Sequence, residues 1–411
     1  MMNSEKLSQT PSLECAISGL DSWIAKNGWQ GYDPYDIIGS PVFLALQRKT
    51  GQRTIARRAI AALLFRLEQR FPLEMRHLFR IEKRINPKAM GLFVRAYTRI
   101  FEATGDASFL QKAKICADWL LRNPSTGYPG LSWGYPFDWQ SIVLIPRGTP
   151  SAVVSSIIGD GLWNLARVTG DARYADACDR IVQFLLRGLN KTEFNGSMLC
   201  FSYTPIDHYL VHNANLLAAE FIARIGRARG KSEWLDIAVR AGNFALSEMN
   251  DDGSLFYWGH SQNANSPNHL DCYHSGFEIR ALIGLAEATG DSRFDKAARK
   301  YFHFFHKKYL RSDGAVQTLP GRLYPIDIHA CAEMLLCTAV AQSFDAQRSR
   351  AFIGSTLPWI LRTMRNTDGS FAYVAYSPHR IIRLPYIRWG QAWMLCALSE
   401  IAAWKETHNA S

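Results

Sequence analysis

The feature that most constrains the fold of this chain is an internal repeat of about sixty residues. Its landmarks are Thr-Gly-Asp at 104–106, 169–171 and 289–291, and Arg229-Gly230-Lys231 fills the missing position. Each landmark separates two apolar stretches with helical spacing. Glycine suits the left-handed position just past a helix end, and Asp suits the start of the next helix. Each tripeptide therefore predicts a tight turn between antiparallel helices, and the repeat predicts an array of helical hairpins.

A second series of turns falls between these landmarks. Asp-Gly pairs at 252–253, 313–314 and 368–369 lead into short extended segments, and the Gly/Trp/Tyr-rich segment 130–140 occupies an equivalent position. Long aromatic loops thus alternate with short glycine turns. Because one connection of every hairpin is long and the other short, we expect all long loops on one face, where functional residues should gather.

The apolar stretches divide into two sets. Those that follow a long loop predict inner helices at 36–49, 86–104, 150–168, 209–228, 273–289, 327–343 and 386–403. Those that follow a short turn carry more charge on one side and predict outer helices at 53–69, 107–122, 172–188, 232–249, 292–309 and 347–364, together with 12–27. The prediction is an all-α (α/α) toroid of six or seven helical hairpins, formed by a single domain over 1–411. An open superhelical solenoid is the alternative, and the polar residues at the inner-helix starts favour closure around a shared cavity.

Composition limits the class of protein. Hydrophobic residues make up 47% of the chain, no run of eighteen apolar residues occurs, and the polar start at 1–6 lacks a signal-peptide core, so we expect a cytoplasmic globular protein. None of the eight Cys residues forms a C-x-x-C pair, which indicates free buried thiols in a reducing compartment. We therefore expect no metal and no cofactor. A zinc site drawn from Asp271, Cys272, His274 and His329 remains the alternative.

The net charge of +11 is unevenly distributed. Basic residues crowd 66–99 and again 379–388, and a basic surface attracts polyanions such as nucleic acid, a membrane leaflet or an acidic saccharide. No nucleic-acid-binding motif accompanies either cluster. The first cluster is equally explained as a solvated helix face, whereas the second lies just before an inner helix and favours substrate contact.

Histidines mark the starts of three inner helices. His274 and Glu278 lie four residues apart, as do His329 and Glu333, so each carboxylate shares a helix face with an imidazole that it could orient. His208 and His212 have the same spacing and precede Asn213. Histidines placed around one cavity indicate general acid–base chemistry, although any one of them could instead cap a helix or fill a polar niche.

Aromatic, acidic and basic residues surround the same predicted face. Rings in loops beside hydrogen-bonding groups suit sugars, and helix N-termini with nearby arginines favour an anionic ligand such as an acidic saccharide or sugar phosphate. The candidate substrate-binding residues are Tyr32, Asp33, Asp36, Trp133, Tyr135, Asp138, Trp139, Arg147, His208, His212, Asn213, Trp258, His260, Tyr273, Arg388 and Trp389.

At these residues the chain resembles a group of carbohydrate enzymes. The alternating pattern, the Thr-Gly-Asp turns and the Tyr273-His274 helix start resemble the α/α-toroid enzymes of the N-acylglucosamine 2-epimerase superfamily, the uronyl C5-epimerases and the unsaturated glucuronyl hydrolases. Asp271-Cys272-Tyr273-His274 is similar to an Asp-Tyr-His helix start in the uronyl C5-epimerases. The resemblance covers most of the chain as architecture but only short motifs in detail. It implies a toroid enzyme of bacterial polysaccharide metabolism with acid–base histidines at His274 and His329.

The leading functional hypothesis is an epimerase or isomerase acting on an acidic sugar. In it His274 and His329 exchange a proton, Glu278 and Glu333 hold them, and Arg388 and Arg147 bind the anionic group. A glycoside hydrolase or lyase with paired carboxylates is the second hypothesis. A prenyltransferase-like toroid and a noncatalytic saccharide-binding toroid are the remaining alternatives.

Overall fold

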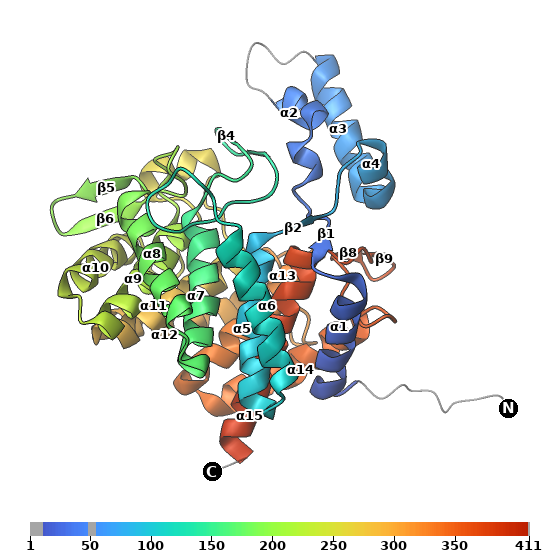
Figure 1. Ribbon diagram of the computed structural model, residues 1–411. Coiled ribbons are helices and arrows are strands. Elements are labelled where there is room, and N and C mark those ends of the chain that lie inside the picture. The colour runs from blue at the N-terminus through green and yellow to red at the C-terminus, as the bar shows by residue number, and fades with distance from the viewer. Residues whose placement is uncertain (1–10, 48–54, 410–411) are drawn as a thin grey trace.

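The computed structural model describes residues 11–47 and 55–409 and consists mainly of helices arranged in two concentric layers (Figure 1). The inner helices are α5 (Pro87–Thr104), α7 (Ala152–Thr169), α9 (His212–Arg229), α11 (Cys272–Thr289), α13 (Ile328–Val340) and α15 (Trp393–Asn409). The outer helices are α6 (Ala107–Arg122), α8 (Ala172–Arg187), α10 (Ser232–Ser247), α12 (Ser292–Tyr309), α14 (Ala346–Thr363) and α1 (Leu13–Asn27).

The inner helices form a closed ring. Each packs against the next along the chain, and α15 packs against α5, while α1 covers α15 as the sixth outer helix. The predicted (α/α) toroid is therefore confirmed with six helical pairs, and the solenoid alternative is wrong. The inner helices are buried around most of their circumference, which explains why their sequences are apolar on all sides.

The short turns form as the repeat predicts. Gly105, Gly170 and Gly290 have φ values of +70°, +67° and +73°, and each backbone N–H donates to the last turn of the preceding inner helix. The Asp that follows each glycine caps the next outer helix, as Asp171 does by accepting from the N–H of Arg173. Local chemistry thus sets the ends of both helices at each turn.

The first predicted helical pair does not join the ring. The 36–49 and 53–69 stretches instead form an arm of α2 (Pro41–Gln47), α3 (Ile55–Arg70) and α4 (Pro72–Leu78), which projects beyond the long-loop face (Figure 1). Positions 48, 49, 53 and 54 lie outside the described residues. The arm has its own small core of Ile37, Phe43 and Met75, so its helices bury their apolar faces against one another and not against the ring.

Short antiparallel strands order the loops at the long-loop face. They are β1 (Gln30–Gly31) with β2 (Arg84–Ile85), β3 (Trp139–Gln140) with β4 (Leu144–Ile145), β5 (Lys191–Phe194) with β6 (Met198–Phe201), and β7 (Ile326–Asp327) with β8 (Val374–Ser377) and β9 (Arg380–Ile382). β1 and β2 join the two ends of the segment that carries the arm. A six-residue π-helical turn, Ile387–Ala392, precedes α15 and carries Arg388 and Trp389.

Within the described part of the chain, no helix is long and apolar enough to cross a membrane. The polar start at 1–6, on which the prediction of no signal peptide depends, lies outside the described residues. All eight cysteines are free, as predicted; seven are buried and Cys15 is exposed.

Candidate functional site

Two inner helices begin with an aspartate cap at the long-loop face. Asp271 caps α11 by accepting from the N–H of His274, and Asp327 caps α13 by accepting from the N–H of His329. Side chains in the first turn of a helix point back toward its N-terminus, so His274 and His329 both extend toward the loops. The ring of Tyr273 lies between them, 4.5 Å from the His274 ring and stacked at 4.7 Å on the His329 ring.

Asp271 bonds two histidines at once. Its Oδ2 lies 2.6 Å from Nδ1 of His274 and 2.8 Å from Nε2 of His269. Burial raises the pKa of Asp271, but the two imidazoles more than offset this and hold it below its usual range. The same bond raises the pKa of His269. The side chain of His274 is 22% exposed, and its Nε2 has no hydrogen-bond partner among the described residues. This arrangement fixes the proton on Nδ1 and leaves Nε2 as a base.

His329 lies deeper and is unpaired. It is 1% exposed, stacks between Tyr273 and Trp393, and neither ring nitrogen has a hydrogen-bond partner among the described residues. Burial and the nearby charges of Lys88 and Arg388 hold its pKa well below the usual value, so the ring is a neutral imidazole.

Asp327 completes this side of the site. It accepts two bonds from the indole N–H of Trp389, at 2.7 and 3.0 Å. Burial raises its pKa to about 7 despite these donors. Asp327 is thus a carboxyl group that gains and loses a proton near neutral pH, whereas Asp271 stays ionised.

Lys88 is a site residue that the sequence analysis missed. It occupies the second position of α5, is 3% exposed, and its ammonium lies 5.5 Å from the Phe277 ring centroid and 5.4 Å from that of Trp393. No carboxylate among the described residues bonds it. Burial and the charge of Arg388 lower its pKa well below the usual range. A single lysine after Asn86-Pro87 gives no functional signal in the sequence, because only the closed ring buries its amine.

Arg388 is held by Asp33. The guanidinium forms two bonds to the carboxylate, at 2.5 and 2.6 Å, and lies over the rings of Trp389, Tyr135 and Tyr35. An anionic ligand would therefore meet an arginine whose charge is already partly balanced. Tyr135 and Trp139 are half-buried and contact one another edge to face. Their partly exposed rings are therefore candidates for stacking against a sugar ring.

A cavity of about 350 Å³ lies between the arm and the β3–β4 loop. Its lining includes the predicted residues Tyr32, Asp33, Asp36, Asp138 and Arg147, with Arg80 and Arg84. Asp33 borders this cavity and also holds Arg388, which links the cavity to the residues around His329. We call Lys88, Asp271, His274, Asp327, His329 and Arg388, with the rings packed on them, the loop-side site.

The two predicted glutamates do not hold the histidines. Glu278 accepts from the hydroxyl of Tyr301 at 2.7 Å, and Glu333 pairs with Arg280 at 2.7 Å. The spacing of four residues places each Glu on the same helix face as its His, but side chains of neighbouring helices supply closer partners. Asp271 takes the expected role of Glu278 by bonding the His274 imidazole, whereas Asp327 accepts from His329 only the backbone N–H and leaves that ring unpaired.

Several predicted residues lie apart from the loop-side site. His212 packs on Phe244 of α10, and its Nε2 lies 3.6 Å from Glu248, as does Nδ1 of the exposed His260. His212 therefore faces outer helix α10. His208 is exposed, Asn213 is buried, Trp258 packs on Tyr209, and the buried Trp133 donates to the carbonyl of Leu120. Of the three predicted histidine positions, only those of His274 and His329 come together, with the ring of Tyr273 between them.

The zinc alternative does not fit the observed contacts. The thiol of Cys272 points at the carbonyl of Ala330, and burial raises the pKa of both Cys272 and Cys331. Among the described residues, His269, Asp271 and His274 place their ligand atoms within 4.8 Å of one another. Because one oxygen of Asp271 already receives both histidines, this trio is arranged as a hydrogen-bonded relay.

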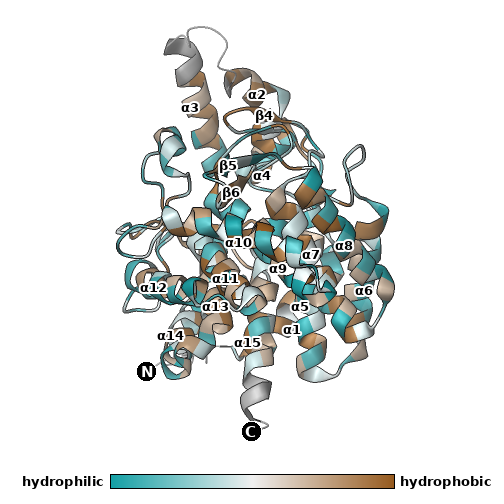
Figure 2. Cartoon of the chain, turned by 90° about the vertical axis from the view of Figure 1, so that its left-hand side faces the viewer, coloured by the Kyte–Doolittle hydropathy of each residue, from teal (hydrophilic) through white to brown (hydrophobic). Residues whose placement is uncertain are grey.

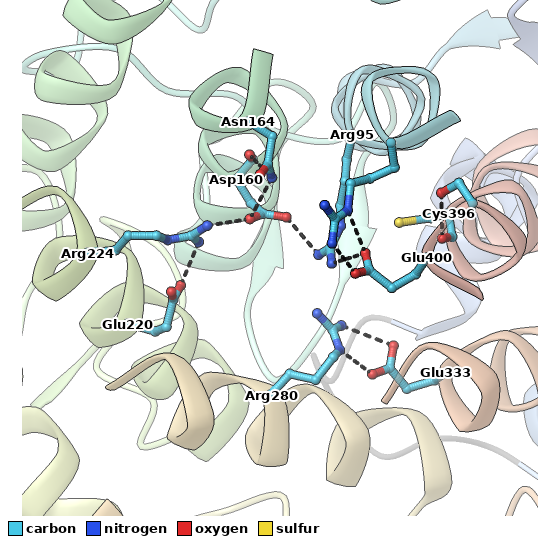
Figure 3. Close-up of polar contacts among 11 residues, drawn as sticks. Arg95, Asp160, Asn164, Glu220, Arg224, Arg280, Glu333, Cys396 and Glu400 are labelled. Carbon is cyan, nitrogen blue, oxygen red and sulfur yellow. Dashed lines mark hydrogen bonds and ion pairs between the residues drawn. The ribbon is translucent and has the colours of Figure 1, made fainter. Parts of the chain in front are cut away.

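The opposite end of the ring carries a second set of charges (Figure 3). Arg95 pairs with Asp160 and Glu400 at 2.8 and 2.9 Å, and Arg224 pairs with Asp160 and Glu220. With Arg280, which pairs with Glu333, they border a cavity of about 340 Å³ near the short turns. We call this set the short-turn network. Each of its arginines faces at least one carboxylate, and its residues come from all six inner helices.

Comparison with known protein families finds none that matches the sequence, and comparison with curated proteins finds no match either. Solved structures do match the fold. An unsaturated glucuronyl hydrolase specific for heparin is 13% identical with a TM-score of 0.60, over 95% of each chain. A GH76 α-mannanase from Bacteroides thetaiotaomicron is 14% identical with a TM-score of 0.60, over 78% of this chain and 87% of that one. Cellobiose 2-epimerase from Bacillus thermoamylovorans is 14% identical with a TM-score of 0.56, over 77% and 87%. The chain has the α/α-toroid fold of these carbohydrate-active enzymes.

Proposed function

We propose that this protein is a carbohydrate-active enzyme that moves a proton at a sugar carbon next to a carbonyl or carboxylate, as an epimerase or isomerase does. The observation that carries the proposal is the 2.6 Å bond from His274 Nδ1 to Asp271, which leaves Nε2 as an unpaired base beside the neutral His329. The shared fold with sugar epimerases and an isomerase supports the substrate class.

In the proposed reaction His274 Nε2 takes the proton from the substrate carbon. The C–H electron pair moves into an enediolate, whose negative charge lies near the guanidinium of Arg388 and the buried amine of Lys88, and this charge favours the protonated form of the amine. Asp271 stabilises the imidazolium that forms. His269, which shares Asp271 and is more exposed, offers the proton a route toward solvent.

Proton return decides the product. Delivery to the opposite face of the same carbon gives an epimer, and delivery to the neighbouring carbon gives an isomer. His329 is a neutral imidazole, which donates a hydrogen bond to a developing oxyanion without carrying a charge of its own. A sugar ring packs on the apolar faces of the aromatic rings of Tyr135, Trp139 and Trp389. Arg80, Arg84 and Arg147 border the adjoining cavity and favour a saccharide with a carboxylate group.

The test is solvent-deuterium incorporation into a panel of reducing and uronate-containing saccharides incubated with the protein. The wild type should introduce deuterium at the carbon next to the carbonyl or carboxylate, and His274→Ala should lower the rate by roughly two to four powers of ten. His303→Ala, an exposed histidine on outer helix α12, is the matched control and should leave the rate unchanged. Equal incorporation by His274→Ala would contradict the proposal.

Hydrolysis is the second candidate, and the pKa values of two carboxyl groups favour it. Asp327 has a pKa of about 7 while Asp271 is held ionised, and such a pair divides the acid and base roles of a glycosidase. Release of a new reducing end without deuterium incorporation, abolished in Asp327→Asn, would assign the chemistry to these carboxyl groups.

A further inference from the structure

The arm exposes an unusual share of the large apolar side chains. Of the twelve exposed large hydrophobic residues in the described chain, seven lie between 42 and 78. Leu78 is 71% exposed, Leu63 56% and Ile60 50%, and Val42, Phe65, Phe71 and Leu73 complete the set. Figure 2 shows this apolar colouring along α2 and α3, which stand clear of the ring. Apolar surface concentrated on one projecting element indicates an interaction site.

The same segment carries most of the net charge. Residues 41–85 contain eleven Lys and Arg and three Glu, a net charge of +8 out of +11 for the chain. Arg66, Arg70, Arg80 and Lys83 are exposed, whereas the exposed acids are Glu74 and Glu82. Whatever covers the apolar side chains is therefore expected to be negatively charged.

The arm is held firmly at its base. Arg76 is fully buried, pairs with Asp36 at 2.9 Å and Glu68 at 3.2 Å, and donates to the carbonyl of Asp33. Leu64, Leu67 and Phe79 pack inward on the arm's own core. The arm therefore already has a hydrophobic core, and its outward apolar side chains are additional to that core.

We propose that the arm docks on an anionic membrane surface. Leucine, isoleucine and phenylalanine enter the boundary between headgroups and acyl chains, while arginine and lysine bind anionic headgroups at the same depth. A second copy of the arm would bring one segment of net charge +8 against another, and nucleic acid would leave the apolar side chains in water. The membrane matches both properties of the surface.

Docking also concerns the cavity at the base of the arm. Phe79, Arg80, Ile81 and Glu82 directly follow α4 and line the cavity of about 350 Å³. A docked arm therefore presents this cavity to material attached to the membrane. This interaction is independent of the proposed chemistry, and no sugar is needed to test it.

The experiment is sedimentation of the full chain with phosphatidylcholine vesicles, with and without phosphatidylglycerol. Binding should require phosphatidylglycerol and weaken with salt. Arg66→Gln/Arg70→Gln should weaken the partition coefficient about 30-fold, because each basic residue near an anionic surface contributes about 1 kcal/mol. Leu63→Glu/Leu78→Glu should reduce binding at least as much. Leu323→Glu, an equally exposed leucine outside the arm at 59% exposure, is the control and should bind normally.

Three results would overturn the proposal. One is absence of vesicle binding by the wild type. Another is binding that Leu63→Glu/Leu78→Glu leaves intact, which would indicate an electrostatic polyanion site. The third is a dimer in solution, detected by light scattering, that the same double variant converts to a monomer, because the patch would then be an interface between copies.

Discussion

The two ends of the ring are built from the same six inner helices but treat charge in opposite ways. At the short-turn end, Arg95, Arg224 and Arg280 each face a carboxylate within 3 Å. At the loop end, Lys88 and His329 are buried without a hydrogen-bonding partner among the described residues. Burial of an unpaired polar group is costly, so folding alone does not explain the loop end. This difference supports the proposal that one end holds the ring together and the other binds a ligand.

The pKa values do not divide by end of the ring, because each follows the burial and partners of its own group. Arginine partners hold the pKa of Glu400 at about 2 and that of Asp160 below its usual range, but burial raises the pKa of Glu220 and Glu333 in the same network. At the loop end two imidazoles lower the pKa of Asp271, whereas burial raises that of Asp327 to about 7. Groups with pKa values displaced toward neutrality are characteristic of functional sites.

The largest expected effect is on activity, at the loop end. Asp271→Asn removes the acceptor that fixes the tautomer of His274, so turnover should fall by roughly two to four powers of ten while the melting temperature changes little. Steady-state kinetics and thermal unfolding on the same preparation measure both. A variant that unfolds, or one that keeps its turnover, would remove Asp271 from the mechanism.

The short-turn end should respond in the opposite way. Glu333→Leu leaves the charge of Arg280 buried and unpaired, and should lower the free energy of unfolding by about 3–5 kcal/mol. Arg280→Leu/Glu333→Leu removes both charges and should recover most of that loss. Denaturant titration of the three proteins gives the comparison. If the double variant is as unstable as the single one, charge pairing is not what this network contributes.

The sequence predicted the ring well because its signals are local. A glycine after a helix and an aspartate before the next one act within a few residues, so outer helices such as 107–122 and 292–309 were predicted at their observed bounds. The arm was placed wrongly because helical periodicity at 36–49 and 53–69 predicts that one face of each helix is buried. It does not indicate which element covers that face.

The site was predicted less completely because it depends on neighbours. His274 and His329 could be located at helix starts, and Asp271 was recognised only as part of the Asp271-Cys272-Tyr273-His274 helix start and of the zinc alternative. The partners of Glu278 and Glu333 come from α12 and α11, which no spacing along one helix reveals. Lys88 becomes unusual only when the closed ring removes it from water.

Glu400 at the short-turn end and Asp327 at the loop end should also differ in the sign of their contributions to the pH dependence of stability. Glu400 has a lowered pKa, so its contribution to stability is present above the unfolded value of about 4.3 and is lost as the pH falls toward 2. Asp327 has a raised pKa, so stability is highest below the unfolded value and declines as the pH rises toward 7. The free energy of unfolding of Asp327→Asn should therefore rise, relative to that of the wild type, by roughly 1–3 kcal/mol as the pH increases from 5 to 8. Urea titrations of both proteins at pH 5 and at pH 8 measure this change. A difference between the two proteins that stays the same at both pH values would contradict the raised pKa of Asp327.

The smallest effect on stability is expected at Lys88. Lys88→Met keeps the length of the side chain and its packing on Phe277 and Trp393 but removes a buried amine that has no carboxylate partner. The free energy of unfolding should therefore stay within about 1 kcal/mol of the wild type or rise slightly.

Turnover of Lys88→Met should nevertheless fall, because the enediolate loses a nearby cation. Since Lys88 also lowers the pKa of His329, the acidic limb of the pH–rate profile should shift to higher pH. Lys88→Arg, which restores the charge, is the control for this shift. If Lys88 only fills space, the pH–rate profile of Lys88→Met should equal that of the wild type. That result would remove the evidence that the loop end, unlike the short-turn network, is built for catalysis.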